Sequence, residues 1–280
     1  MSNCHSPSLI RQPITMTSSI SSSPIDLQLH DGIAVLALNR PEVRNALDDA
    51  TRIVLIEALD RVAADSTVRA LVITGHGKAF CAGGDIRSMQ QRAQAPAGEL
   101  AFNGWARQQR THHAVSLLHA MPKPTIAAVN GPATGLGADL AMSCDFVVTS
   151  ATASFAWNYV LRGLIPDGGG LYFLPRRVGL VRAKELIFSG RTVQADEAMQ
   201  LGIADRISAP EALLDDACSW AVELSQGSGA ARALAKSILD KSFELSVDEV
   251  FSQGSLAQGI CYTTTGHQAS IAAFLNKEKK

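Results

Sequence analysis

The residues of this sequence best suited to chemistry are one carboxylate and two glycine-containing turns. The carboxylate is Asp167 in LIPDGGG (Leu164 to Gly170), between an apolar run with a proline and three consecutive glycines. Aspartate in such a setting is common in turns, where its side chain can cap a helix. The same carboxylate could instead act as an acid or base on a bound substrate. The segment alone leaves both interpretations open.

The two glycine-containing turns could supply an oxyanion hole. In AFCAGGDI (Ala79 to Ile86) and in NGPATGLGADL (Asn130 to Leu140), an expected strand runs into small residues and then into an expected helix start. Small residues let a ligand approach the backbone, and N–H groups at a helix start have no partner within the helix. Two such ends facing each other would direct two N–H donors at one oxygen. Glycine turns in α/β proteins are also often plain turns, so spacing alone does not decide.

Other catalytic signatures are missing from the sequence. It contains no GxxxxGK[ST] phosphate loop, no GxSxG nucleophile elbow and no full dinucleotide fingerprint. The five scattered cysteines form no CxxC pair and no Cys/His cluster, which predicts neither a disulfide framework nor a metal site. Cys81 lies beside one glycine turn, but no histidine is placed by motif to activate it, so we interpret it as a core residue.

The segments around these motifs predict an α/β fold. Strands alternate with helices, a pattern typical of helices that cover the faces of a sheet. After Gly179 the periodicity becomes mostly helical. We expect three regions: a disordered tail over residues 1–24, an α/β core over residues 25–205 and a helical region over residues 206–280. The elements expected in the core include a hairpin at 26–39 turning at Gly32, helices at 47–65, 98–120 and 135–145, and strands at 69–75, 124–130 and 145–150.

Composition narrows the class of partner. The chain has 280 residues, 46% of them hydrophobic, and a formal net charge of −1. This balance offers no basic field for nucleic acid and no polybasic run for an anionic membrane. No stretch approaches the ~18 uninterrupted apolar residues of a membrane-spanning helix. We therefore expect a cytoplasmic protein whose partners are small molecules or copies of itself.

Four segments together resemble the crotonase, or enoyl-CoA hydratase/isomerase, superfamily over residues 25–280. They are LNRPEVRNAL (Leu38 to Leu47), AFCAGGDI, KPTIAAVNGPATGLGADLAMSCD (Lys123 to Asp145) and GLIPDGGG with the downstream LPRRVG. The resemblance implies a ClpP/crotonase-like spiral of ββα units followed by a helical C-terminal region. It also implies a homotrimer or homohexamer in which helices of residues 206–280 pack on neighbouring subunits.

The resemblance also implies the substrate and the residues that bind it. The substrate is a coenzyme A thioester, with no permanently bound cofactor and no metal. The oxyanion hole falls on the backbone N–H groups of Gly84 and Leu136. The coenzyme A moiety lies along the four residues Arg44, Ala82, Asp85 and Ile86.

Departures from the family pattern favour an isomerase. Hydratases of the family hold a water with two glutamates, and those positions are Asp139 and Tyr159 here. Tyrosine, with an unperturbed pKa of about 10, is a poor base near neutrality. Asp167 instead matches the acid/base of the branch that includes 1,2-epoxyphenylacetyl-CoA isomerase. A hydratase that uses Asp139 and water, and a non-catalytic acyl-CoA binding protein, remain as alternatives.

Two further sets of residues are weaker candidates. The aromatic residues Phe102, Trp105, Trp157 and Tyr159 could line an acyl pocket, although such residues are as often plain core. His112 and His113 lie on the expected long helix, where we expect a solvated or packed role.

Overall fold

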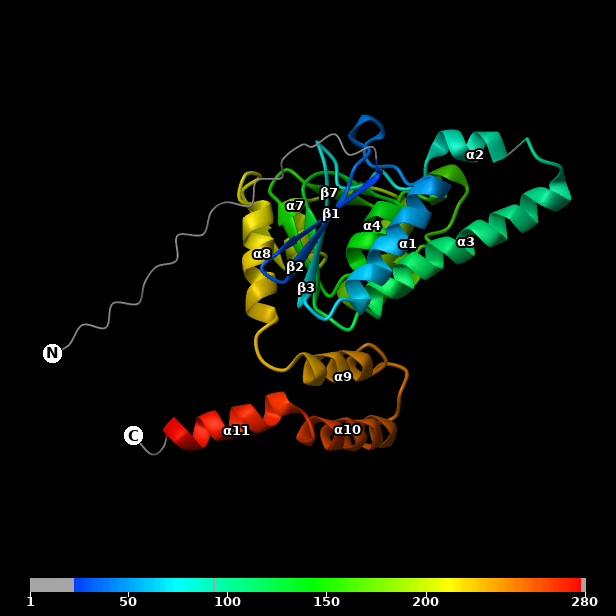
Figure 1. Ribbon diagram of the computed structural model, residues 1–280. Coiled ribbons are helices and arrows are strands. Elements are labelled where there is room, and N and C mark those ends of the chain that lie inside the picture. The colour runs from blue at the N-terminus through cyan, green and yellow to red at the C-terminus, as the bar shows by residue number, and fades with distance from the viewer. Residues whose placement is uncertain (1–22, 93, 278–280) are drawn as a thin grey trace.

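A six-stranded sheet forms the centre of this computed structural model, which describes residues 23–92 and 94–277 (Figure 1). Its strand order is β1-β2-β3-β4-β6-β9. The first two strands pair antiparallel and all later neighbours pair parallel. The tail expected over residues 1–24 lies outside the described residues except for residues 23 and 24. The strands span Ile25–His30 (β1), Ile33–Leu38 (β2), Ala70–Gly75 (β3), Thr125–Val129 (β4), Phe146–Ser150 (β6) and Arg206–Ser208 (β9).

The hairpin between β1 and β2 turns where the sequence predicts. Asp31 and Gly32 have φ angles of 49° and 81°. Positive φ at both central residues is the requirement of a type I′ turn, which matches the twist of the flanking strands. Aspartate and glycine are among the residues that adopt this conformation at low cost.

Helices cover both faces of the sheet, which confirms the α/β class. All six residues of β2 are buried, and successive side chains point to opposite faces. Leu36 and Leu38 pack in the cluster that includes residues of α1, α3 and α4, whereas Val35 packs in the cluster with α8. Figure 1 shows α8 on one side of the sheet and α1, α3 and α4 on the other. These helices span Asp49–Ala64 (α1), Ala97–His119 (α3), Leu136–Met142 (α4) and Leu213–Leu224 (α8).

A second sheet, of three strands, lies beside the first. The Asp167 turn lies in the segment between the last two of these strands in the chain. The strand order of the second sheet is β5-β7-β8, with strands at Ala133–Thr134, Ser154–Ala156 and Thr192–Gln194. Short elements link the two sheets to the surrounding helices. They are α2 (Ile86–Arg92), α5 (Gly170–Val178), α6 (Leu180–Ser189), α7 (Ala195–Leu201) and the 3₁₀ turns η1 (Pro41–Val43) and η2 (Val160–Arg162).

The expected boundary after residue 205 does not coincide with the edge of the sheet core. Strand β9 pairs with β6, and α8 buries Cys218 and Ala221 against the central strands. The reason is that β9 adds a parallel strand to the sheet and α8 covers one of its faces, and both elements follow residue 205. The last three helices are α9 (Gly229–Leu239), α10 (Val247–Tyr262) and α11 (Thr265–Lys277). Helix α9 contacts the core through the ion pair of Lys236 with Asp145 at 2.9 Å, whereas α10 and α11 lie farther from the sheet in Figure 1.

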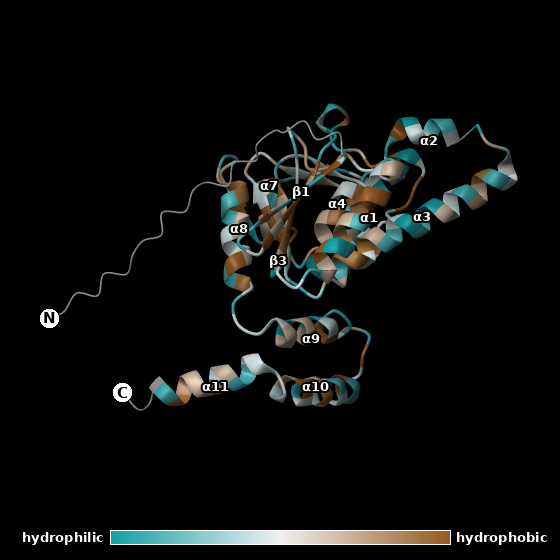
Figure 2. Ribbon diagram, viewed as in Figure 1, coloured by the Kyte–Doolittle hydropathy of each residue, from teal (hydrophilic) through white to brown (hydrophobic). Residues whose placement is uncertain are grey.

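The last helices expose much apolar surface. Phe251, Leu256 and Ile260 of α10 are all exposed, and α9 and α10 have no buried residue. Figure 2 shows hydrophobic segments on these helices as well as in the central strands. No helix in the described part of the chain is long and apolar enough to cross a membrane.

Candidate active site

The backbone N–H of Gly84 points away from Leu47, the residue whose backbone bonds to the segment around Gly84. Leu47 N donates to Gly83 O at 2.8 Å, and Asp85 N donates to Leu47 O at 3.1 Å. These two bonds form a parallel bridge between Leu47 and Gly84. In such a bridge the residue between the two bonded neighbours, here Gly84, has its own N–H and C=O pointing away from the partner segment. Within the described residues, no acceptor is bonded to the Gly84 N–H.

The second candidate donor, the N–H of Leu136, begins α4 and touches the first glycine turn. As the first helical residue, Leu136 has no intrahelical acceptor for its N–H. A Cβ added at Gly83 would lie 2.6 Å from Thr134 O and 3.3 Å from Leu136 N. Gly83 also has a φ of +91°, which side chains disfavour. Glycine at this position is what allows the two turns to approach.

Both candidate donors open on one cavity. This cavity, the donor cavity, has a volume of about 200 Å³ and is lined by Gly84, Leu136, Tyr159, Asp167, Arg52 and Arg107 among others. A larger cavity of about 690 Å³ lies on the other side of Asp167, between α3, α5 and α9. Asp167 is therefore the acidic residue that the two cavities share.

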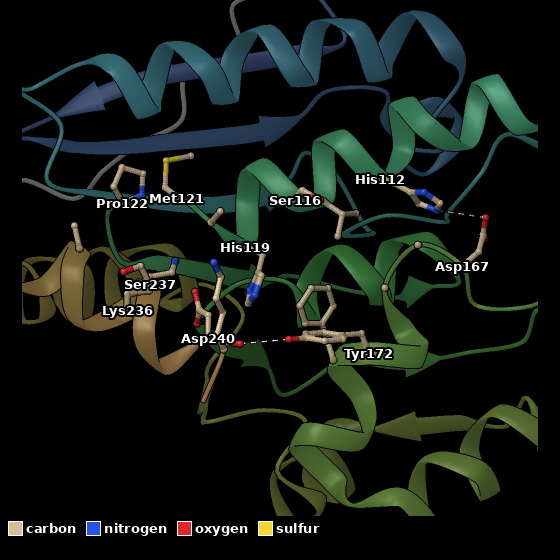
Figure 3. A pocket seen from close by; sticks show the side chains of 17 residues that line it. His112, Ser116, His119, Met121, Pro122, Asp167, Tyr172, Lys236, Ser237 and Asp240 are labelled. Carbon is tan, nitrogen blue, oxygen red and sulfur yellow. Dashed lines mark hydrogen bonds and ion pairs between the residues drawn. The ribbon is translucent and has the colours of Figure 1, made fainter. Parts of the chain in front are cut away.

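The carboxylate of Asp167 does not cap a helix. Helix α5 has Gly169 at its N-cap and no side-chain bond there. The Asp167 backbone forms a tight turn, with its N–H donating to Ile165 O at 2.9 Å. Its Oδ2 lies 4.0 Å from Nε2 of His112, and Figure 3 shows the two side chains pointing toward each other at one end of the larger cavity. The turn is confirmed, and the carboxylate remains available to a ligand.

The three glycines after Asp167 make room for a buried carboxyl group. A Cβ at Gly168 would lie 2.8 Å from Asp139 Oδ2 and 2.4 Å from Leu136 Cδ1. A Cβ at Gly170 would lie 2.5 Å from Asp139 Oδ1. Contacts this short are not tolerated in a packed interior. The glycine run thus lets the Asp167 turn pack directly on α4.

Asp139 is sealed in the core by two aromatic side chains. It is 0% exposed, the Trp157 Nε1 donates to its Oδ1 at 3.0 Å and the Tyr159 hydroxyl donates to its Oδ2 at 2.6 Å. Burial raises the pKa of the Asp139 carboxyl to about 7, against these two bonds, which lower it. Burial and the adjacent Asp139 raise the pKa of Tyr159 well above its ordinary value. Tyr159 therefore stays protonated and donates.

The aromatic candidates for the acyl pocket separate into three situations. Tyr159 lines the donor cavity. Trp157 requires a correction, because its ring is 0% exposed and its indole N–H is turned inward to Asp139. Phe102 and Trp105 lie at the solvent-exposed part of α3, with ring centroids 5.9 Å apart, and line neither cavity.

The candidate coenzyme A residues lie close to the Gly84 turn. Ala82 N donates to Arg44 O at 2.9 Å, which joins the two segments. Asp85 caps α2, accepting from Arg87 N at 2.9 Å, and forms an ion pair with Arg40 at 3.5 Å. Ile86 is 61% exposed. Three of the four residues thus flank Gly84 in the chain, and the Asp85 carboxylate is buried and already paired.

Cys81 has the buried environment expected of a core residue. Burial raises the pKa of its thiol to about 12, so it is protonated near neutrality. Across the described ranges, no group of three or more His, Cys, Asp or Glu side chains could hold a metal ion.

Two residues near Asp167 escaped the sequence analysis. They are Arg52 of α1 and Arg107 of α3, which line the donor cavity. His112 of α3, for which we expected a solvated or packed role, faces Asp167. Arg107 and His112 belong to the polar residues of α3, which are also typical of a solvated helix face. Arg52 could have been recognised only as a charged residue within the mostly apolar face of α1.

This chain is similar to several known proteins over most of its length. A family model described as enoyl-CoA hydratase/isomerase matches residues 28–280. A crotonyl-CoA hydratase of Syntrophomonas wolfei is 37% identical over 91% of this chain and 96% of its own. A 1,2-epoxyphenylacetyl-CoA isomerase of Escherichia coli is 33% identical over 88% and 93%. The crystal structure of an enoyl-CoA hydratase/isomerase from Cupriavidus metallidurans has a TM-score of 0.83 at 34% identity, covering 91% of this chain and 94% of that one.

Proposed function

Because this chain belongs to the enoyl-CoA hydratase/isomerase family, whose members act on coenzyme A thioesters, we propose that it is an enoyl-CoA isomerase with Asp167 as its acid/base. It has the two-sheet crotonase fold of that family. The proposed reaction moves the double bond of a 3-enoyl-CoA to C2.

The proposed steps use one carboxylate and two backbone donors. The thioester carbonyl accepts hydrogen bonds from the N–H groups of Gly84 and Leu136. Asp167 removes a proton from C2, and the electrons of the broken C–H bond form a dienolate whose oxygen is held by the two donors. The same proton is returned at C4, leaving the double bond between C2 and C3. Donors already in place need no reorganisation, and removing one from a comparable site costs about 2.7–4 kcal/mol.

One observation carries the proposal. Asp167 lines the same cavity as Gly84 and Leu136, whereas the Asp139 carboxyl has no exposed surface. A base must reach within hydrogen-bond distance of the proton it removes. This supports Asp167 rather than Asp139 as the acid/base.

The coenzyme A moiety is proposed to lie along Arg44, Ala82, Asp85 and Ile86. Arg44 is exposed and its guanidinium could form charge-assisted hydrogen bonds with a phosphate. The exposed Ile86 offers an apolar contact beside the Gly84 turn.

Hydration is the second candidate. Tyr159 lines the donor cavity and its hydroxyl bonds to Asp139, so a water bound at Tyr159 would be linked to that carboxyl. The Syntrophomonas wolfei relative is named a crotonyl-CoA hydratase. A non-catalytic acyl-CoA binding protein is the third candidate, although such a protein has no need of a carboxylate over the acyl chain.

One assay separates the three candidates. The protein is incubated with a 3-enoyl-CoA and, separately, with a 2-enoyl-CoA, and the products are identified by mass and by absorbance of the conjugated thioester. We expect the 3-enoyl-CoA to become a 2-enoyl-CoA of unchanged mass. Formation of hydroxyacyl-CoA from the 2-enoyl-CoA, without alkene shift, would assign hydration. Binding without any product would assign the non-catalytic alternative.

The exposed apolar side chains of α10 support a homotrimer or homohexamer. Monomers rarely expose large contiguous apolar patches. Light scattering coupled to size-exclusion chromatography should give three or six times the 29.7 kDa chain mass. A monomer at micromolar concentration would contradict this assembly.

A further inference from the structure

The carboxylate of Asp167 has one neighbour suited to hold it in place, the imidazole of His112. Across residues 23–92 and 94–277, this is the only ion-pair contact of the carboxylate, with 4.0 Å between Asp167 Oδ2 and His112 Nε2. A group that removes a proton works only from a narrow range of positions relative to the substrate. What holds the carboxylate therefore matters for the proposed reaction.

The turn at Asp167 fixes its backbone but not its carboxylate. The backbone N–H donates to Ile165 O, and two glycines without side chains follow the aspartate. The side chain lines both the donor cavity and the larger cavity. Rotation about its single bonds could therefore turn the carboxylate into the larger cavity, away from the N–H groups of Gly84 and Leu136.

His112 stands on an element that is itself held firmly. Its neighbours Thr111, Val115 and Leu118 in α3 are buried, and the last two pack in the core cluster that includes residues of α1. The helix backbone is thus anchored, while the imidazole emerges into the larger cavity and faces Asp167 (Figure 3). A side chain on an anchored helix can fix the position of one on a turn.

Other polar groups of the larger cavity serve other partners. Lys236 forms an ion pair with Asp145 at 2.9 Å. The ring of His119 contacts that of Phe173, with centroids 4.9 Å apart. Figure 3 shows Lys236 and His119 away from the end of the cavity at which His112 meets the carboxylate.

The gap between His112 and Asp167 is one that substrate binding can close. A separation of 4.0 Å is about 1 Å longer than a hydrogen bond. Catalytic hydrogen bonds are often long without substrate and shorten in the complex. The two side chains are 45% and 26% exposed, so both have room to rotate. Nε2 carries a hydrogen in the imidazolium and in one neutral tautomer, and either form can donate to a carboxylate.

We propose that His112 is a positioning residue for Asp167. When a thioester occupies the donor cavity, the Nε2–H of His112 donates to Oδ2 of Asp167 and leaves Oδ1 directed at the acyl chain. Oδ1 takes the proton from C2 and returns it at C4, while Oδ2 stays bonded to His112. The inference rests on the proposed role of Asp167 as acid/base. His112 acts through Asp167 and does not touch the substrate.

Two substitutions at His112 separate the hydrogen-bond donor from the ring. His112→Phe keeps a ring and removes the N–H, so kcat for a 3-enoyl-CoA should fall ~10–100-fold, the range expected when a base is displaced by about 1 Å. His112→Gln keeps an N–H donor at a similar reach and should retain kcat within ~3-fold of the parent. The dissociation constant of the saturated thioester butanoyl-CoA, measured by calorimetry, should change less than ~2-fold in both variants.

His113→Phe is the matched control. His113 is the next residue of the same helix, is exposed and lines neither cavity, so this variant should keep the parental kcat and affinity. A His112→Phe variant with parental kcat would overturn the proposal. So would a His112→Gln variant as impaired as His112→Phe, or a loss of butanoyl-CoA affinity that accounts for the lost activity.

A double variant tests whether His112 acts through Asp167. In the Asp167→Asn background no base remains to be positioned, so adding His112→Phe should lower the residual activity no further. Independent effects would instead multiply. A further ~10-fold loss in the double variant would assign His112 a role separate from Asp167 and would refute the proposal.

A crystal structure with butanoyl-CoA bound tests the pairing without turnover. The distance from His112 Nε2 to Asp167 Oδ2 should shorten to ~2.7–3.2 Å. A protein that shows this distance but shifts no double bond would refute the proposed isomerisation and keep this inference. A protein that isomerises 3-enoyl-CoA, keeps a separation of about 4 Å and tolerates His112→Phe would do the reverse.

Discussion

The hydroxyl of Tyr159 donates a 2.6 Å hydrogen bond to Oδ2 of Asp139, and this bond turns the Asp139 carboxyl into the core. Trp157 holds the other oxygen at 3.0 Å, so neither oxygen faces the donor cavity. The position that carries a water-holding glutamate in the hydratases this chain resembles is therefore a buried anchor between α4 and the Tyr159 segment. A substitution of Asp139 is therefore expected to change the stability of the fold more than the rate of the reaction.

The raised pKa of Asp139 predicts a pH-dependent stability. Because the pKa is about 7 in the folded protein and about 3.8 in the unfolded chain, the folded state binds the proton more tightly. The resulting stabilisation is complete below pH 3.8 and is lost as pH rises through 7, at ~1.4 kcal/mol for each pKa unit at most. Asp139→Asn removes this dependence. Its free energy of unfolding, measured in urea relative to the parent, should be more favourable at pH 8 than at pH 5.

The asparagine variant keeps the hydrogen bonds of the site. Its Oδ1 can accept from Trp157, and its amide can donate to the Tyr159 hydroxyl, which then acts as acceptor. Groups that titrate equally in both proteins cancel in the comparison. A stability difference that is the same at pH 5 and pH 8, or larger at pH 5, would show that Asp139 is ionised throughout this range.

Asp167→Asn should abolish isomerisation while preserving binding. Asparagine keeps the size of the side chain but cannot exchange the proton between C2 and C4. We expect kcat/KM for a 3-enoyl-CoA to fall at least ~10²-fold, the low end of general-base contributions, with acyl-CoA affinity nearly unchanged. Asp139→Asn should cost far less. An inactive Asp139→Asn beside an active Asp167→Asn would transfer the chemistry to the hydratase candidate.

Two substitutions at Leu136 test the proposed backbone donor. Leu136 is the first residue of α4, a position at which helices tolerate proline, so Leu136→Pro removes the N–H with a limited effect on the helix. The rate constant kcat should fall by ~10²–10³-fold. Leu136→Ala keeps the N–H and should retain activity within ~10-fold. If both variants stay folded by circular dichroism and lose activity equally, the N–H of residue 136 is not a donor to the substrate.

Gly168→Ala should be destabilising, because the new methyl group would overlap Leu136 Cδ1 and approach Asp139 Oδ2. Overpacking of this kind costs ~1–3 kcal/mol, and it would also displace the Asp167 turn. Gly104→Ala in α3 is the matched control, since no atom lies within 4 Å of the added Cβ. That variant should be stabilised by ~0.5–1 kcal/mol. The free energy of unfolding of both variants is measured by thermal or urea unfolding. Equal values would mean that the Asp167 turn moves to accommodate the added methyl group without cost.

The sequence by itself determined the local structure and the order of the candidate site segments. The Asp31–Gly32 turn, the Asp85 cap of α2 and the turn at Asp167 depend on residues only a few positions apart. Turn and capping preferences act at that range, so they can be read from the chain. The α/β class followed from the same local periodicities.

The tertiary structure alone decided which side chains meet around Asp167 and the donor cavity. His112 meets Asp167 across two elements, and Arg52 and Arg107 reach one cavity from α1 and α3. Trp157, expected at the pocket, is turned inward. Helical and strand periodicity indicate which face of an element is buried, but not which neighbour lies opposite that face. That choice depends on the packing of α1, α3 and α4 on the sheet, where contacts distant in sequence outweigh local preference.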